Sequence, residues 1–165
     1  MENIISVQFE KNSSYKGITG MLKGGTGSYT GFRGCSNLTT VILPDTMEYI
    51  GYYSFESLSE LTNIQLSKQM KFIYDRAFTG DLKLTLTGNA LPNTIEKLGI
   101  SAFSGCNALI LTSLPDSIKT LSKGVFAYCG NVTITEFGYV KNATEQSATS
   151  NGLEEIGEGA LRGIN

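Results

Sequence analysis

The 165-residue chain has no histidine and no tryptophan, and it has only 3 prolines and 3 cysteines. Without histidine there can be no Ser-His-Asp triad, no Cys–His nucleophile pair and no imidazole ligand for a metal. No two cysteines have the CxxC spacing that is typical of a thiolate metal site. We therefore expect no catalytic residues, no cofactor and no metal.

Charge is also scarce. Asp, Glu, Lys and Arg make up 17% of the residues. The chain has 13 basic and 15 acidic residues, which gives a net charge of −2. A protein that binds nucleic acid usually carries a basic patch, so nucleic acid is not an expected partner. No apolar run approaches the length of a membrane span, so membrane insertion is not expected either. The first residues lack the basic start of a signal peptide.

What the chain does have is a repeat of about 23 residues that is anchored on phenylalanine. The intervals between anchors are 23, 23, 25, 23 and 35 residues. A single unit of this length cannot bury its own apolar residues, so the units are expected to stack into a solenoid. The anchors are Phe32, Phe55, Phe78, Phe103 and Phe126, with Leu161 as a final variant.

Each unit predicts two short extended segments. In the first unit Leu38, Val41 and Leu43 follow the anchor, and Pro44 then ends a strand, because proline has no N–H for a ladder. Equivalent strands should pair in parallel, ~4.8 Å apart. The return path to the next anchor is too short for an α-helix, so it should be a brief strand or a 3₁₀ turn.

The segment from Phe32 to Gly51 resembles the BspA-like class of leucine-rich repeats, as do the segments that begin at Phe103 and Leu114. The resemblance covers roughly residues 32–164. It implies a right-handed, mainly β solenoid of parallel strands with short 3₁₀ or strand returns. It also implies a place in a larger bacterial surface or secreted protein that acts in adhesion or binding.

One domain is expected at this length, in two parts. Residues 1–31 are predicted to form an N-terminal strand and a Gly/Ser/Thr-rich cap or insertion, and residues 32–165 five repeats with an insertion at about 138–152. An uncovered last strand would be an adhesive edge, so a cap, a further segment or a second subunit should cover it.

The three cysteines each stand three residues after an anchor, in a mostly apolar column. Cys35, Cys106 and Cys129 are therefore expected to be buried, free thiols. Cys106 and Cys129 lie in adjacent units and could come within disulfide range, but their side chains should point the same way.

The strand positions eight and ten residues after each anchor should point away from the core and form the concave, ligand-binding sheet. Leu86, Leu111 and Ile134 would then be an exposed apolar stripe; alternatively, the strand phase slips in these units, so that the leucines face inward and the threonines outward. The predicted face comprises Thr40, Ile42, Asn63, Gln65, Leu86, Leu111, Ser113, Ile134 and Glu136.

A second candidate surface is an aromatic group on the return segments, because tyrosine suits binding sites, although it also fills the surfaces of charge-poor β proteins. Its members are Tyr49, Tyr52, Tyr53, Phe72 and Tyr74.

The sequence thus favours a non-enzymatic scaffold that binds a protein or a glycan in adhesion. The alternative is a structural spacer that self-associates through its terminal coils. Carboxylate pairs could serve glycoside hydrolysis, but candidates such as Glu154, Glu155 and Glu158 are expected to be solvated surface charges.

Overall fold

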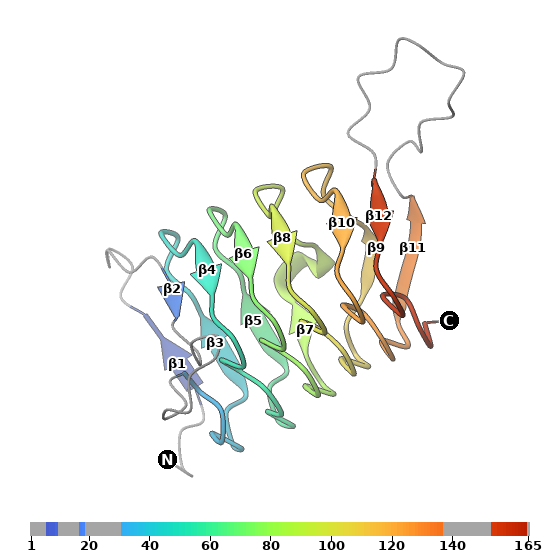
Figure 1. Ribbon diagram of the computed structural model, residues 1–165. Coiled ribbons are helices and arrows are strands. Elements are labelled where there is room, and N and C mark those ends of the chain that lie inside the picture. Colours follow the sequence, from blue (N-terminus) through green and yellow to red (C-terminus); the bar gives the residue numbers. More distant parts are fainter. Residues whose placement is uncertain (1–5, 10–16, 19–30, 137–152, 165) are drawn as a thin grey trace, which may run out of the picture.

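The computed structural model describes residues 6–9, 17–18, 31–136 and 153–164. In these residues twelve short strands alternate between two faces, so each coil contributes one strand to each face (Figure 1). The strands of the first sheet are β1 (Ser6–Gln8), β3 (Thr40–Ile42), β5 (Asn63–Gln65), β7 (Thr85–Leu86), β9 (Leu111–Ser113) and β11 (Val132–Glu136). The strands of the return sheet are β2 (Gly17–Ile18), β4 (Tyr49–Ile50), β6 (Phe72–Ile73), β8 (Lys97–Leu98), β10 (Thr120–Leu121) and β12 (Glu155–Ile156).

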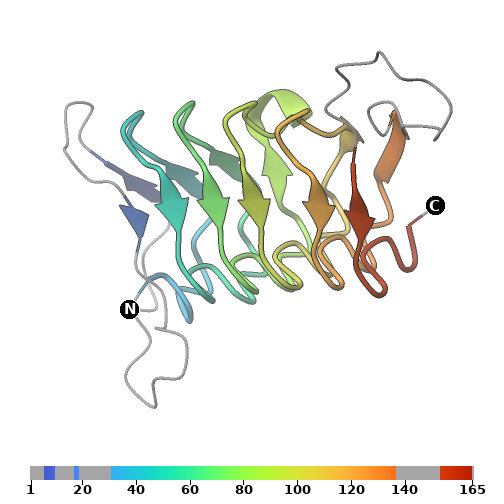
Figure 2. The same cartoon turned by 45° about the horizontal axis from the view of Figure 1, so that its top comes forward.

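Neighbouring coils pair in parallel on both faces. The first sheet runs β1-β3-β5-β7, with β9 and β11 as a separate pair, and the return sheet runs β2-β4-β6-β8, with β10 and β12 as a separate pair. Seen from above, the strands of the return sheet lie in one row from β2 to β12 (Figure 2). The predicted solenoid of parallel strands with strand returns is confirmed. The pairing of β2 with β4 adds a return strand inside the N-terminal region, which the sequence did not indicate.

The anchors form one ladder of rings through the centre of the solenoid. Phe55 and Phe78 stack with centroids 5.1 Å apart, and Phe103 lies 5.2 Å from Phe78 and 5.8 Å from Phe126. These four side chains are fully buried. Phe32 is less buried and closes the stack on Phe55 at 5.2 Å. The predicted ladder is therefore confirmed.

The three cysteines are buried and free, as predicted. The Cys106 thiol donates to the carbonyl oxygen of Phe78 at 3.1 Å, and the Cys129 thiol donates to that of Phe103 at 2.9 Å. Burial raises the pKa of Cys129 to about 11 and raises that of Cys106 as well. Both groups therefore stay protonated and act as small core residues.

Each coil turns at its anchor through backbone in the left-handed region. The residue two positions before the anchor has φ between 54° and 63° at Tyr53, Arg76, Ser101, Gly124 and Gly159. Two positions after the anchor, the same region is occupied by Gly34, Ser57, Gly80, Gly105, Tyr128 and Gly163. Glycine adopts this conformation without a steric penalty, whereas other residues do so at a cost of roughly 1–2 kcal/mol.

The two extra residues of the third unit interrupt the first sheet. They form part of the short 3₁₀ segment η1 (Thr87–Asn89), in which Gly88 has φ 78°. The first sheet breaks between β7 and β9 at this point. Among the described residues, no helix is long and apolar enough to cross a membrane.

Candidate binding groove on the return sheet

Only some residues of the predicted binding face on the first sheet reach the surface. Ile42, Gln65 and Ser113 are exposed, and Thr40 and Asn63 are half-buried. The side chain of Glu136 lies outside the described structure.

Of the two interpretations of the apolar residues, the exposed stripe is wrong, and the slip of the strand phase is confirmed at Leu86 and Leu111. Leu86 is 3% exposed and Leu111 is 0% exposed, while Thr87 and Thr112 are exposed instead. Leu86 pairs with Ile64, which is a core residue. Leu86 follows the interior Leu84 by two residues, whereas Ile64 follows the equivalent Leu61 by three. A shift of one residue turns every side chain of a strand to the other face. Ile134 is half-buried and packs against the same core.

Four of the five aromatic residues predicted on the return segments do come together. The ring of Tyr74 stacks on that of Tyr52 at 4.9 Å, lies 6.1 Å from Phe72, and meets Tyr49 edge-on at 6.3 Å. All four side chains are half-buried, so they pack on each other and still reach the surface. We call these four residues the aromatic cluster.

Tyr53 does not join this cluster. Its ring lies between two guanidinium groups, 5.9 Å from Arg33 and 5.7 Å from Arg76. Such cation–π contacts stabilise an exposed ring modestly, by about 0.5–1 kcal/mol each.

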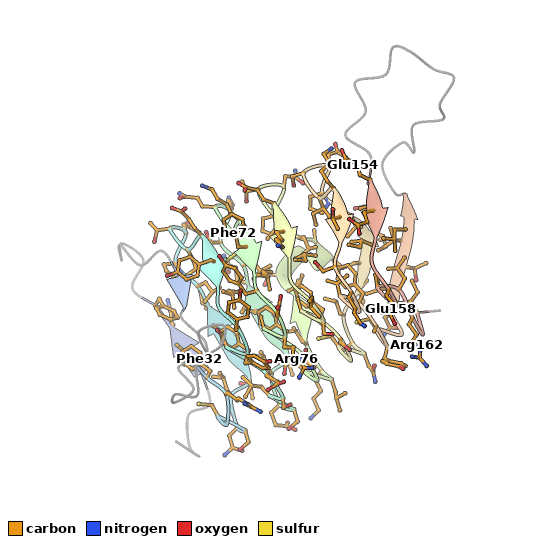
Figure 3. The ribbon with its side chains drawn as sticks, viewed as in Figure 1. Phe32, Phe72, Arg76, Glu154, Glu158 and Arg162 are labelled. Carbon is orange, nitrogen blue, oxygen red and sulfur yellow. The ribbon has the colours of Figure 1, made fainter. Side chains whose placement is uncertain are left out.

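A groove of about 510 Å³ begins at the aromatic cluster and crosses β6, β8, β10 and β12 along the solenoid axis. The groove is lined by rows of residues, and each row is made of equivalent positions in successive coils. Phe72 is labelled near the N-terminal end of the return sheet and Glu158 near the other end (Figure 3). Neighbouring residues of one row are one coil spacing apart. The floor row from Tyr74 to Gly157 therefore covers three spacings, or roughly 14 Å.

The floor is the row four residues before each anchor. It consists of Gly99, Ser122 and Gly157, and Tyr74 occupies the same position in the preceding coil. A Cβ atom at Gly99 would lie 2.4 Å from the backbone nitrogen of Asp75, and one at Gly157 would lie 2.7 Å from that of Lys123. Close stacking of the coils therefore requires glycine at these two positions, and the absence of side chains leaves the groove open.

The walls carry charges of both signs. Lys97, Thr120 and Glu155 stand on one side, and Asp75, Ile100, Lys123 and Glu158 stand on the other. The Lys123 ammonium lies 2.6 Å from a Glu158 carboxylate oxygen, and this hydrogen bond lowers the pKa of Glu158. Burial raises the pKa of Tyr52, and Asp75 and Tyr74 raise it further, so its phenol remains neutral.

Three residues of the floor row already donate their backbone N–H groups to the preceding coil. The N–H of Tyr74 donates to Ile50 at 2.9 Å, that of Gly99 to Ile73 at 2.7 Å, and that of Gly157 to Leu121 at 2.7 Å. A bound molecule therefore meets side chains, and not these main-chain donors. The groove can hold and orient a ligand by stacking and by side-chain hydrogen bonds.

Sequence reasoning found the aromatic cluster but missed the rest of the groove. None of the other groove residues indicates a binding site by itself, for example Gly99, Ser122, Lys97 or Lys123. The signal was present in the repeat, because one tyrosine, Tyr74, interrupts a row that otherwise holds glycine or serine.

A solenoid of short coils, each with one strand on the first sheet and a two-residue return strand, is a leucine-rich-repeat protein. The chain belongs to the BspA type leucine-rich repeat family, whose model matches residues 27–151 in 6 copies. Leucine-rich repeats of this kind are generally protein-interaction scaffolds.

Three solved structures are similar. A *Treponema pallidum* leucine-rich repeat protein has a TM-score of 0.65 and 20% identity, over 98% of this chain and 78% of that one. A leucine-rich cell surface protein from *Faecalibacterium prausnitzii* A2-165 has a TM-score of 0.61 and 22% identity, over 98% of this chain and 42% of that one. A leucine-rich repeat protein from *Bacteroides ovatus* ATCC 8483 has a TM-score of 0.57 and 26% identity, over 78% of this chain and 38% of that one.

No curated protein matches the chain. The chain spans well under half the length of the *B. ovatus* and *F. prausnitzii* proteins. Likeness at 20–26% identity bears on the fold.

Proposed function

We propose that this chain is a non-enzymatic binding module that holds an extended partner in the groove of the return sheet. One observation carries the proposal: the aromatic cluster ends in an open groove that the packing of the solenoid does not fill. Pockets of 300–1,000 Å³ with aromatic walls and a few polar groups are the usual form of ligand sites. The first sheet becomes the weaker candidate, because its apolar stripe lies in the core.

A role in adhesion, at the cell surface or in a secreted protein, fits this module. The F. prausnitzii relative is described as a cell surface protein, and leucine-rich repeats of this family are generally protein-interaction scaffolds. Binding without catalysis is supported by the chain's lack of histidine. It is also supported by Glu158, whose lowered pKa keeps it ionised and makes it a poor general acid at neutral pH.

The double variant Tyr52→Ala/Tyr74→Ala tests the groove. We expect it to lose binding to ligands selected by the native protein on peptide and glycan arrays, because it removes the stacked pair that ends the groove. Tyr128→Ala is the matched control, since Tyr128 is an exposed tyrosine on another part of the surface. Circular dichroism should show that both variants keep the native fold.

Two outcomes of the array experiment would contradict the proposal. The first is that no ligand of either class binds the native protein. The second is that the ligands that do bind are retained equally by the double variant and by the Tyr128→Ala control.

A structural role through the terminal coil is the second candidate, and one observation favours it. Ile156 of β12 is 56% exposed, although its equivalents Leu98 and Leu121 are fully buried. Exposed apolar residues beside a strand edge favour contact with another chain. If this end self-associates, the native protein should form dimers or larger species in light scattering. Ile156→Lys should return it to monomers, and Leu82→Lys, a similarly exposed control, should not; a monomeric native protein would contradict this candidate.

A further inference from the structure

We infer that the groove binds a neutral glycan that places the face of one sugar ring against Tyr74. This inference rests on the proposed function and names its ligand class. Three features of the described residues carry it: the aromatic end wall, the chemistry of the side walls, and the main-chain donors that are already bonded to the neighbouring coil.

The end wall is a flat apolar surface. The rings of Tyr52 and Tyr74 form a stacked pair with centroids 4.9 Å apart. Gly99, the residue equivalent to Tyr74 in the next coil, has no side chain. A planar group placed over Gly99 would continue this stack at the same coil spacing. The C–H face of a pyranose ring is such a group, and aromatic rings with a polar edge suit ligands that are apolar on one face and polar at the rim.

The side walls match hydroxyl groups better than they match a peptide or an ion. A hydroxyl both donates and accepts, so it can use the carboxylates, which only accept, and the ammonium groups, which only donate. Each wall carries both signs, with Lys97 and Glu155 on one and Asp75, Lys123 and Glu158 on the other, so neither sign dominates. An anionic chain would meet the three carboxylates, and a cationic one would meet the two lysines.

A peptide is the poorer fit because of its backbone. Each residue of an extended peptide brings one N–H and one C=O group that need partners. The main-chain donors of Tyr74, Gly99 and Gly157 are already bonded to the neighbouring coil. A peptide in this groove could not add a strand to the sheet, which is one of the ways in which proteins bind extended peptides.

Titration calorimetry with neutral 1,4-linked oligosaccharides tests the inference. The probes are chains of one to five units of β-linked glucose, xylose, mannose and N-acetylglucosamine, with α-linked glucose for comparison. We expect at least one series to bind. Tyr74→Ala should weaken binding about tenfold, the loss expected for one stacking contact. Tyr74→Phe and Tyr128→Ala should stay close to the native affinity.

The outcomes separate this inference from the proposed function. If none of the oligosaccharides binds but a peptide binds and is lost in Tyr52→Ala/Tyr74→Ala, the glycan inference is wrong and the binding groove stands. If oligosaccharides bind equally to the native protein and to Tyr74→Ala, the proposed stacking site is wrong. If neither ligand class binds, both proposals are wrong.

Discussion

Phe103→Ala is expected to lower the free energy of unfolding by about 3–5 kcal/mol. The Phe103 ring is fully buried and contacts the anchors of both neighbouring coils, at 5.2 Å on the Phe78 side and 5.8 Å on the Phe126 side. Its removal leaves a cavity that the paired backbone cannot close, because the Phe103 N–H still bonds to the Val125 carbonyl at 2.9 Å.

The position of Phe103 in the middle of the stack adds to this effect. In a solenoid each coil contacts only its neighbours, so a weak coil reduces the coupling between the two halves. Thermal or urea unfolding followed by circular dichroism measures the loss, and we expect the melting temperature to fall by roughly 10 °C. Tyr128→Ala, which removes an exposed aromatic ring, should change stability by much less. A loss below about 1 kcal/mol for Phe103→Ala would mean that the ring is not the central rung that the packing indicates.

Asp81→Asn is expected to stabilise the protein, and to do so more strongly as the pH rises. Asp81 is 0% exposed and stands in the column that otherwise holds Cys35, Leu58, Cys106 and Cys129. One carboxyl oxygen accepts the Leu58 N–H at 2.7 Å, and the other has no hydrogen-bond partner. Burial raises the pKa of Asp81 to about 9; the Leu58 N–H lowers it in part, and Glu56 raises it.

The sign of the pH effect follows from this raised pKa. Between about pH 4 and pH 9 the unfolded chain has lost the Asp81 proton while the folded chain keeps it, so this group destabilises the fold as the pH rises. The slope for one such group is about 1.4 kcal/mol per pH unit. Asparagine keeps the oxygen that accepts from Leu58 but cannot ionise, so it removes this dependence.

Urea unfolding of the native protein and of Asp81→Asn at several pH values tests the prediction. The advantage of the variant should grow by about 4 kcal/mol between pH 5 and pH 8, the product of three units and the slope for one proton. Asp116→Asn, at an exposed aspartate, is the matched control and should show no such growth. A constant difference between native protein and Asp81→Asn across this range would contradict the raised pKa.

The repeat predicted the architecture because every coil buries the same positions. Phe55, Phe78, Phe103 and Phe126 could be placed in one ladder from their spacing alone. The strands that follow them were predicted for the same reason, since a leucine or valine at each equivalent position must face the core.

The phase slip after Phe78 could not be decided from the sequence. Leu86 is eight residues after its anchor, where Thr40 and Asn63 face outward in the first two units. The chain instead turns Leu86 into the core and exposes Thr87, because burying a leucine outweighs keeping the regular register. Only the pairing of Leu86 with Ile64 settles the choice.

The left-handed turns could not be predicted from the sequence for a different reason. Tyr53, Arg76 and Tyr128 occupy positions where glycine would be the usual indicator. The groove could not be predicted because it is defined by small residues, Gly99 and Gly157. These residues leave space and carry no functional group of their own. An aromatic residue can be recognised in a sequence, but the empty row beside it becomes visible only when the coils are stacked.

The most direct measurement is a map of backbone amide chemical shifts when a ligand selected on the arrays is titrated into the labelled protein. The account predicts that Gly99, Ser122 and Lys123 on the return sheet shift as the ligand binds, while Asn63 and Gln65 on the first sheet do not. The opposite pattern, with shifts confined to the first sheet and none along the groove, would contradict the claim that this solenoid binds its partner through the return sheet.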